Sequence, residues 1–547
     1  MRKFFYVMLA ILVSTSCAQA RTHTNKTFLM PRSHLDNMAM EYSTWHKQFR
    51  DIDEEKWGSS IQATGFYQES TNQSALGKYF GKYNNATGPN ITNPYAGTIQ
   101  DFIWVMERSV LAGTPNFNNE KALLLESRWI IHDPKEFTPS SERLNVKGTF
   151  RPKQESYGIR LDYHQKLDKL AKGLYFKVSV PFVDVTNDME IAYTGTADSS
   201  RLTQTLPDQD LVAAASRVKK SLADYLSGNI TTTRQKALTH AKIAGSDSDS
   251  GVADIDVTLG YNFLYKEHKH LNANICLTIP TGNRVRGEKL FEAMVGNGHH
   301  WALGCGVDSA FELWKDEDSS LDFLFAANYK YLFDATEKRT LDFKYSNTAG
   351  TNVAAPLDTF LTAGKRVPMG YYFLGGKRGE RQLFPLANVL TRDVGVDPGS
   401  QLEVLASLAF NHKGFTFDLG YNLFAKEGES VMVKDWPENT YAIAKQSFKE
   451  AAGADELIPL FDPTNINHAW GGGDGYKPMA IAREHLLEQD AATPVYVTHK
   501  IFGGMGYSYD EWDYPLMFGL GGSWEFTQGT NSALDGWALY GKIGVSF

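Results

Sequence analysis

Residues 537–547 read Trp-Ala-Leu-Tyr-Gly-Lys-Ile-Gly-Val-Ser-Phe, and this stretch decides the fold. Its odd-numbered positions carry Trp, Leu, Gly, Ile, Val and Phe, while its even-numbered positions carry Ala, Tyr, Lys, Gly and Ser. Because successive side chains of a strand point to opposite faces, the pattern predicts a strand with one apolar face and one face that tolerates charge. Such a strand needs others of the same kind to complete a sheet.

The same alternation recurs along the chain and predicts a set of twelve strands. They are expected at residues 61–68, 157–165, 174–182, 254–265, 271–279, 301–313, 321–333, 402–410, 415–423, 495–509, 516–526 and 537–547. Residues 122–132 and 357–375 are further candidates, so the predicted range is twelve to sixteen. Short linkers near residues 168, 268, 317, 413 and 512 alternate with long ones, which is typical of bacterial membrane barrels.

The N-terminus has the features of an export signal. Arg2 and Lys3 precede an apolar run at residues 4–13, and Ala18-Gln19-Ala20 predicts cleavage after Ala20. Cys17 leaves lipidation open as an alternative. Downstream, no apolar stretch approaches the ~18 residues of a membrane-spanning helix. An exported chain of this kind can cross lipid only as a closed sheet, because hydrocarbon offers no partner to an unpaired backbone group.

The predicted fold is therefore an all-β transmembrane antiparallel up-and-down barrel in the bacterial outer membrane, with long extracellular loops that carry short helices and with short periplasmic turns. A signal peptide (1–20) and a periplasmic N-terminal segment (21–56) are expected before the barrel (57–547). Residues 33–49 fit an amphipathic helix capped by Ser33, which either plugs the barrel or lies outside it. A secreted β-sandwich is the alternative fold.

Two sequence features resemble known outer-membrane proteins. The terminal Phe547 resembles the end of the closing strand in Gram-negative outer-membrane barrels, which implies contact with the barrel-assembly machinery and with outer-membrane lipid. Pro280-Thr281-Gly282-Asn283 and the sequence at residues 295–301, VGNGHHW, look like the mouth loops of porin-like and hydrophobic-compound-uptake barrels, including the phenol-degradation-pathway family. This resemblance implies uptake or permeation of small solutes and names no solute.

The alternation also predicts which charged side chains line the lumen. The predicted lumen residues are the acids Asp162, Asp254, Asp256, Asp308, Glu312, Asp322, Glu403, Asp418 and Glu525, the bases Arg160, Lys177, Lys330, Lys500 and Lys542, and His164. An excess of acids along a narrow tube favours cations. The alternative is that these groups pair across strands and keep the interior hydrated, because a barrel of twelve strands is narrow.

Other functional classes find little support in the sequence. A formal net charge of −8 gives no electrostatic basis for binding nucleic acid. A calcium loop beginning at Asp247 would need ligands where Gly251 and Thr258 stand, so we predict no metal site, and we expect no cofactor. Asp162 and His164 lack a recognisable nucleophile, so no catalytic residue is predicted and the protein is not expected to be an enzyme. The predicted function is a channel, with an adhesin-like surface-contact barrel acting through its outer loops as the alternative.

Overall fold

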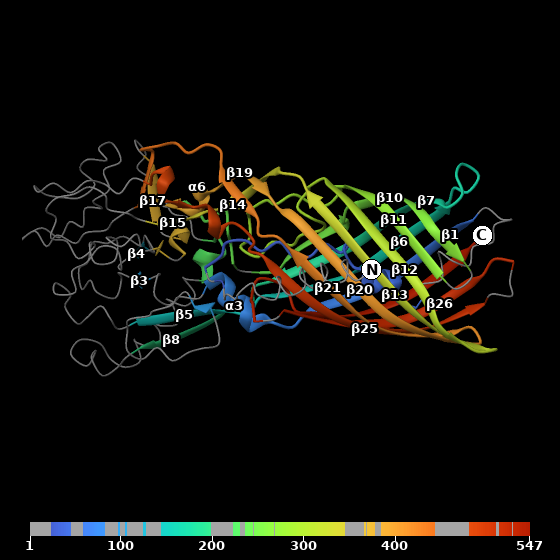
Figure 1. Cartoon of the computed structure of the whole chain (residues 1–547). Coiled ribbons are helices and arrows are strands. Elements are labelled where there is room, and N and C mark those ends of the chain that lie inside the picture. The colour runs from blue at the N-terminus through green and yellow to red at the C-terminus, as the bar shows by residue number, and fades with distance from the viewer. Residues whose placement is uncertain are drawn as a thin grey trace, which may run out of the picture.

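The structure, a computed structural model, is a closed antiparallel β-barrel with a folded region at one end (Figure 1). It describes residues 23, 25–44, 58–81, 97–98, 104–106, 124–126, 144–197, 223–229, 236–243, 245–266, 269–344, 366–367, 369–372, 374–377, 384–443, 481–509, 513–527 and 529–547. In these ranges, no helix has the length and apolar character that crossing a membrane requires.

Each barrel strand pairs with its neighbours in the chain, and the first strand pairs with the last. In order, the strands are β1 (Ser59–Ser70), β6 (Lys153–Lys166), β7 (Leu174–Asp188), β10 (Ile255–Lys266), β11 (Lys269–Ile279), β12 (Ala302–Lys315), β13 (Ser319–Leu332), β20 (Gly399–His412), β21 (Phe415–Lys426), β25 (Tyr496–Tyr509), β26 (Leu516–Thr527) and β27 (Gly536–Ser546). β27 closes the barrel on β1, from Ser60 opposite Ser546 to Ser70 opposite Gly536. The predicted all-β class, the up-and-down order and the count of twelve are confirmed, and the sandwich alternative is wrong.

The two faces of the barrel wall differ as the alternation predicts. On β27, Leu539 is 60% exposed and Ile543 45% exposed on the outer face, while Tyr540 and Lys542 are buried inside. On β1, Ile61 is exposed, whereas the side chains of Gln62 and Thr64 are fully buried. An apolar exterior around a polar interior is the arrangement that a barrel in lipid requires.

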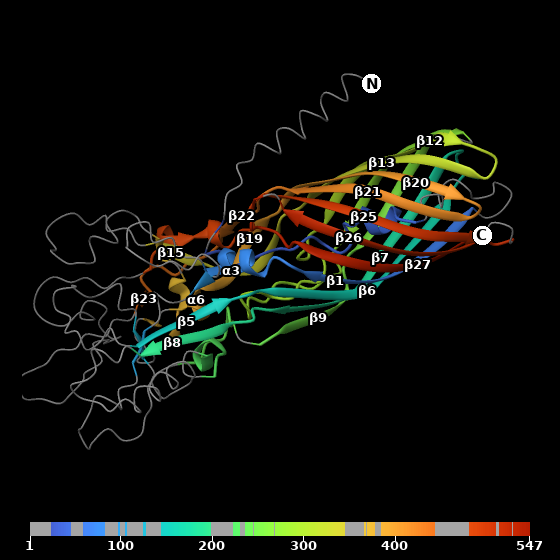
Figure 2. The same cartoon turned by 90° about the horizontal axis from the view of Figure 1, so that it is seen from below.

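The two ends of the barrel are unequal. The short connections between β6 and β7, β10 and β11, β12 and β13, β20 and β21, and β25 and β26 all lie at the end where the chain finishes at Phe547 (Figures 1 and 2). All six long connections lie at the other end. In outer-membrane barrels the short turns face the periplasm, so the long connections are extracellular.

The long connections fold together above the barrel into a region that we call the cap. Its buried core includes Tyr79, Phe80, Phe150, Tyr372 and Leu390. Its helices are α3 (Gln73–Gly81), α6 (Ala387–Leu390), η6 (Gly370–Tyr372), η8 (Arg483–His485) and η9 (Glu488–Asp490). Its strands are β2 (Gly97–Thr98), β3 (Trp104–Met106), β4 (Leu124–Glu126), β5 (Leu144–Phe150), β8 (Ala192–Ala197), β14 (Ala335–Thr340), β15 (Asp342–Lys344), β16 (Arg366–Val367), β17 (Leu374–Lys377), β18 (Phe384–Pro385), β19 (Thr391–Asp397), β22 (Ser430–Val433), β23 (Tyr441–Ile443) and β24 (Leu486–Leu487).

The candidate strands at 122–132 and 357–375 are not barrel strands where the structure describes them. They contribute only β4, β16 and β17, each of which pairs within a small separate sheet. One further strand, β9 (Asp247–Val252), joins the barrel sheet by pairing with residues 182–187, in the half of β7 nearer the extracellular end. Most of residues 200–245, on which the adhesin-like alternative depends, lie outside the described residues.

The loop between β11 and β12 is held by Asp254, directly before β10. Its carboxylate accepts hydrogen bonds from the backbone N–H of Gly282, at 3.2 Å, and of Asn297, at 2.8 Å. Gly296 has a φ of +93°, and a Cβ atom there would lie 2.7 Å from the Asp254 carboxylate. The glycine and asparagine pattern of this motif therefore serves to pin the mouth loop against the barrel rim.

The N-terminal segment crosses the inside of the barrel from the extracellular end. His23 exchanges two hydrogen bonds with Asn531 in the connection between β26 and β27, and Lys26 N–H donates to the Tyr79 carbonyl in the cap. At the other limit, Thr44 N–H donates to Asp418, three residues from the periplasmic end of β21. We call residues 25–30 the anchor and residues 31–44 the plug.

The helix expected at 33–49 is shorter than predicted. α2 spans only Met38–Tyr42, and its N-cap is Asn37, whose side chain accepts from Met40 N–H, rather than Ser33. Residues 45–57 lie outside the described part of the chain. Residues 21–56 were expected to be periplasmic. In the structure, residues 25–44 lie instead in the lumen and at its extracellular mouth.

This orientation predicts from which side of the outer membrane an antibody can reach the chain near His23. An epitope inserted before His23 should bind antibody on intact cells, because His23 lies among the extracellular connections. The same epitope after Lys169, in the turn between β6 and β7, should be bound only after the outer membrane is permeabilised. Protection of the first epitope in intact cells would contradict the threading of this segment.

Candidate functional site

The plug is bound to the barrel wall mainly by charged and polar side chains. At its upper end, Arg32 forms ion pairs with Glu403 on β20 and with Glu525 on β26, the latter at 2.9 Å. The Arg32 guanidinium also lies 4.4 Å from the centre of the Phe424 ring. This single side chain therefore links three strands of the wall.

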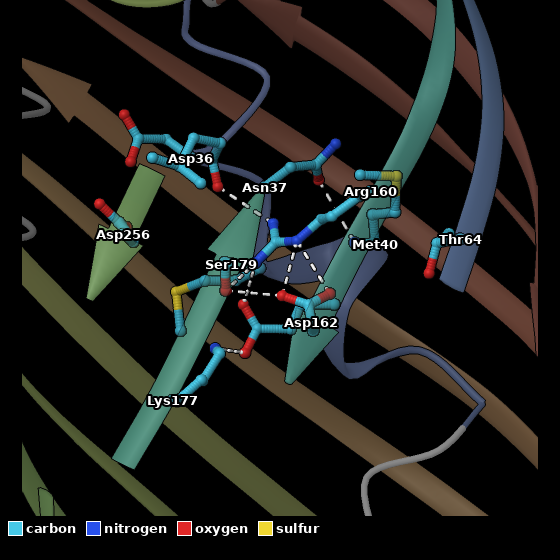
Figure 3. A network of polar contacts seen from close by, with 12 residues as sticks. Asp36, Asn37, Met40, Thr64, Arg160, Asp162, Lys177, Ser179 and Asp256 are labelled. Carbon is cyan, nitrogen blue, oxygen red and sulfur yellow. Dashed lines mark hydrogen bonds and ion pairs between the residues drawn. The ribbon is translucent and has the colours of Figure 1, made fainter. Parts of the chain in front are cut away.

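The centre of the plug carries Glu41, whose carboxylate lies between two bases of the wall. Arg160 Nη2 on β6 is 2.7 Å from one oxygen, and Lys177 Nζ on β7 contacts the other. Figure 3 shows Arg160, Asp162, Lys177 and Ser179 converging on this place from adjacent strands. Arg160 Nε also donates to Asp162 at 3.0 Å, and Ser179 donates to the same carboxylate at 2.6 Å. The wall thus orients one edge of the guanidinium, while Nη1 donates to the Leu35 carbonyl of the plug at 3.0 Å.

The remaining predicted lumen bases also bind the plug. Lys330 donates to Asp36 of the plug at 2.6 Å and to Asp256 of the wall at 2.7 Å. Lys500 donates to Asn37 at 3.1 Å. Lys542 donates to two plug carbonyls, those of Glu41 at 2.7 Å and Ser43 at 2.6 Å. All five bases predicted to line the lumen therefore contact one segment of the chain.

The lower end of the plug fits against a part of the wall that has no side chains. Gly504 and Gly506 on β25 and Gly519 on β26 face Ser43 and Thr44. A Cβ atom on Gly519 would lie 2.2 Å from Thr44 Oγ1. These glycines therefore make the space that the end of the plug occupies.

The other predicted lumen residues lie on the inner face and divide into two groups. Glu403, Asp418 and Glu525 accept bonds from the plug. The rest contact other parts of the barrel. Asp308 accepts a hydrogen bond from Asn272 at 2.8 Å, Asp322 accepts one from Asn411 at 3.0 Å, and Asp256 pairs with Lys330. Asp254 holds the mouth loop, His164 packs on Tyr175, and Glu312 is half-buried opposite Asp322. Pairing across the interior, the second of the two sequence interpretations, describes these contacts.

The residues that complete the site carry no periodic signal in the sequence. Arg32 and Asp36 come from an irregular segment and Glu41 from the short helix α2, and their partners in the wall are more than a hundred residues away in the chain. Gly504, Gly506 and Gly519 interrupt the alternation of residue types on β25 and β26. An excess of glycines on the inner face of two adjacent strands is the signal that indicates an occupant on that side.

Two small hollows remain beside the plug. One has a volume of about 50 Å³ and lies between α2 and the wall around Tyr175, Asn272 and Asp308. The other, of about 70 Å³, lies near His34 and the ends of β25 to β27. A water molecule occupies ~30 Å³ in the liquid, so each hollow holds at most a few waters. Neither hollow has room for a larger solute in this conformation.

The anchor is fixed by a buried ionic cluster in the cap. Arg339 lies over the Phe28 ring, 3.3 Å from its centre, and pairs with Glu337 at 2.6 Å and Glu429 at 3.3 Å. Burial acts to raise the pKa of Glu429, but the charges of Lys426 and Arg339 outweigh it and lower that pKa to about 2. The cluster connects the anchor to β14 and to the rim of β21.

The aspartates that suggested calcium are instead bonded to protein groups. Asp247 and Asp249 pair with Arg286, at 3.4 and 3.2 Å. Among the described residues, no group of three or more His, Cys, Asp or Glu side chains is arranged to hold a metal ion. Ser179 donates to Asp162 and not to His164, so these three residues lack the order of a nucleophile–histidine–acid relay.

Comparisons with known proteins place the chain beside outer-membrane channels at low similarity. No family model matches it, and no curated protein matches it in sequence. Among solved structures it is similar to an outer-membrane channel from Pseudomonas putida F1, with 11% identity, a TM-score of 0.33, and coverage of 90% of this chain and 98% of that chain. The monoaromatic hydrocarbon channel CymD has 10% identity and a TM-score of 0.27, and the match covers 96% of this chain and 99% of that chain. The Pseudomonas putida toluene transporter TodX has 9% identity and a TM-score of 0.25, and the match covers 96% of this chain and 98% of that chain. At these scores the functional argument depends on the geometry of this chain.

The ionic cluster predicts an acid-sensitive cap. Because the pKa of Glu429 is lowered to about 2, its stabilisation is complete above the ordinary value of 4.5 and is lost as the pH falls from there toward 2. Glu429→Gln should destabilise the protein by about 3–5 kcal/mol at pH 7, since it leaves buried bases short of a partner. It should also flatten the fall in thermal unfolding temperature between pH 4.5 and pH 2.

Glu484→Gln is the matched control, because the Glu484 side chain is 77% exposed in the same region. It should leave both the unfolding temperature and its pH dependence unchanged. Equal behaviour of the two variants in detergent-solubilised protein would show that the cluster does not stabilise the cap.

Proposed function

We propose that this protein is an outer-membrane channel for small solutes, closed in the present conformation by its own N-terminal segment. The observation that carries the proposal is the binding of all five lumen bases to the plug inside a closed barrel with a polar inner face. A polar lumen obstructed by a segment that is not part of the sheet becomes a passage for solutes once the obstruction moves.

The plug is built to leave without damage to the barrel. Within the described residues 25–44, no segment joins the ladder of the barrel sheet, so all twelve strands keep their backbone pairing when the plug moves. Its ties are mainly ion pairs and hydrogen bonds. Met38, Ala39 and Met40 also lie in apolar clusters with wall residues, and Tyr42 packs against the clusters around Phe502 and around Leu324. Water that fills the vacated lumen can replace the polar contacts, which favours a reversible obstruction.

Glu41→Gln should open the channel. The substitution removes the charge that holds the plug to Arg160 and Lys177, so the open probability in planar bilayers should rise at least tenfold over that of the native protein. Lys153→Gln is the control, because Lys153 pairs with Glu69 and Glu155 at the rim and not with the plug. The absence of conductance in both the native protein and the Glu41 variant would count against a channel.

A second variant moves the plug without changing any charge. Gly519→Ala places a methyl group against Thr44, so the lower end of the plug must leave its seat and the open probability should rise. Gly541→Ala, on the outer face of the neighbouring strand, meets only Leu520 at 3.6 Å and should behave like the native protein. Identical currents from the two alanine variants would show that the plug does not control conduction.

A further inference from the structure

The Glu41 carboxylate occupies a site that the barrel wall provides. Arg160 has 2% of its side chain exposed, and its guanidinium presents Nη2 to one oxygen of Glu41 while Lys177 reaches the other. Lys542 lies beside them and donates to the Glu41 carbonyl. All three bases belong to strands, so they stay in place when the plug does not.

We propose that this cage of Arg160, Lys177 and Lys542 is the binding site for a carboxylate-bearing small solute, which takes the place of the Glu41 carboxylate when the plug moves. The inference rests on the proposed channel function and names the class of solute that the open lumen recognises. Glu41 is then an internal substitute for the solute, and binding of the solute favours the open state.

The donors that Glu41 leaves behind favour an anionic occupant. With Glu41 gone, Arg160 Nη2 and Lys177 Nζ lose the carboxylate that they bind. Asp162 stays bonded to Arg160 Nε, and Asp308 and Asp418 lie near Lys177 and Lys542. Unpaired buried charges are strongly unfavourable, and an incoming carboxylate restores their pairing.

The donor geometry selects a carboxylate over other small groups. Arg160 and Lys177 each address a different oxygen, as the two oxygens of one carboxylate allow. A neutral amide would turn its NH₂ group toward one of the two cations. A dianion would bring a second negative charge close to Asp162, which already accepts hydrogen bonds from Arg160 and Ser179.

Space for the rest of the solute lies directly beside the cage. The hollow of about 50 Å³ is bordered by Glu41, Arg160 and Lys177 and extends to Tyr175, Asn272 and Asn274. Departure of the Glu41 side chain enlarges it. The amides and the phenol ring supply hydrogen bonds and an aromatic edge for the stem of the solute.

The test uses propionate, which reproduces the end of a glutamate side chain, and propionamide, which is its uncharged counterpart. In planar bilayers at constant ionic strength, propionate should lower the current through the Glu41→Gln variant with a half-effective concentration at least tenfold below that of propionamide. Adding Lys177→Gln to that variant should abolish the difference. Adding Lys153→Gln should leave it unchanged.

Titration calorimetry on the purified Glu41→Gln protein in detergent separates the two proposals. Propionate binding without any conductance overturns the channel and leaves the site standing. Conductance with equal responses to propionate and propionamide overturns the carboxylate site and leaves the channel standing. If the Glu41 variant does not fold, the open probability is measured for the native protein and for Lys177→Gln in the otherwise native chain. Propionate should raise the open probability of the native protein and should not raise that of the Lys177 variant.

Discussion

The pairing of β1 with β27 is the constraint on which the rest of the structure depends. Hydrocarbon offers no hydrogen-bond partner, so the first and last strands must satisfy one another, and Ser59 and Phe547 exchange backbone hydrogen bonds at 2.8 Å in both directions at the seam. Closure separates an interior from the lipid. Only inside that closed wall can buried groups such as Arg160 and Asp162 find partners instead of hydrocarbon.

The interior of a closed barrel of twelve strands also has to be filled, because wall side chains fill a barrel of eight strands and twelve strands enclose more space. The plug meets this need. Its acids bind Arg160, Lys177 and Lys330, and its arginine, Arg32, binds Glu403 on β20 and Glu525 on β26. The same contacts that complete the interior electrostatically also close it to solutes, so stability of the closed state and obstruction of the lumen have one physical origin.

The path of the N-terminal segment gives the two ends of the plug different roles. The anchor is buried in the cap, with Phe28 beneath Arg339 and Leu29 in the apolar core. The lower end is seated on glycines near the periplasmic end. Because apolar burial adds to the ionic cluster in holding the anchor, whereas mainly polar contacts hold the plug, the lumen portion can exchange with water more readily than the portion in the cap.

The sequence by itself determined the wall: twelve alternating strands, their faces, their order, and short turns at one end, because a period of two in side-chain polarity directly reflects which face of a strand meets lipid. It also placed residues such as Lys542 and Glu403 on the inner face. Only the tertiary structure decided what those residues bind. The plug has no repeating pattern, α2 is five residues long, and Glu41 meets Arg160 across 119 positions of chain, a contact set by closure of the barrel around the segment and by no local preference of either residue.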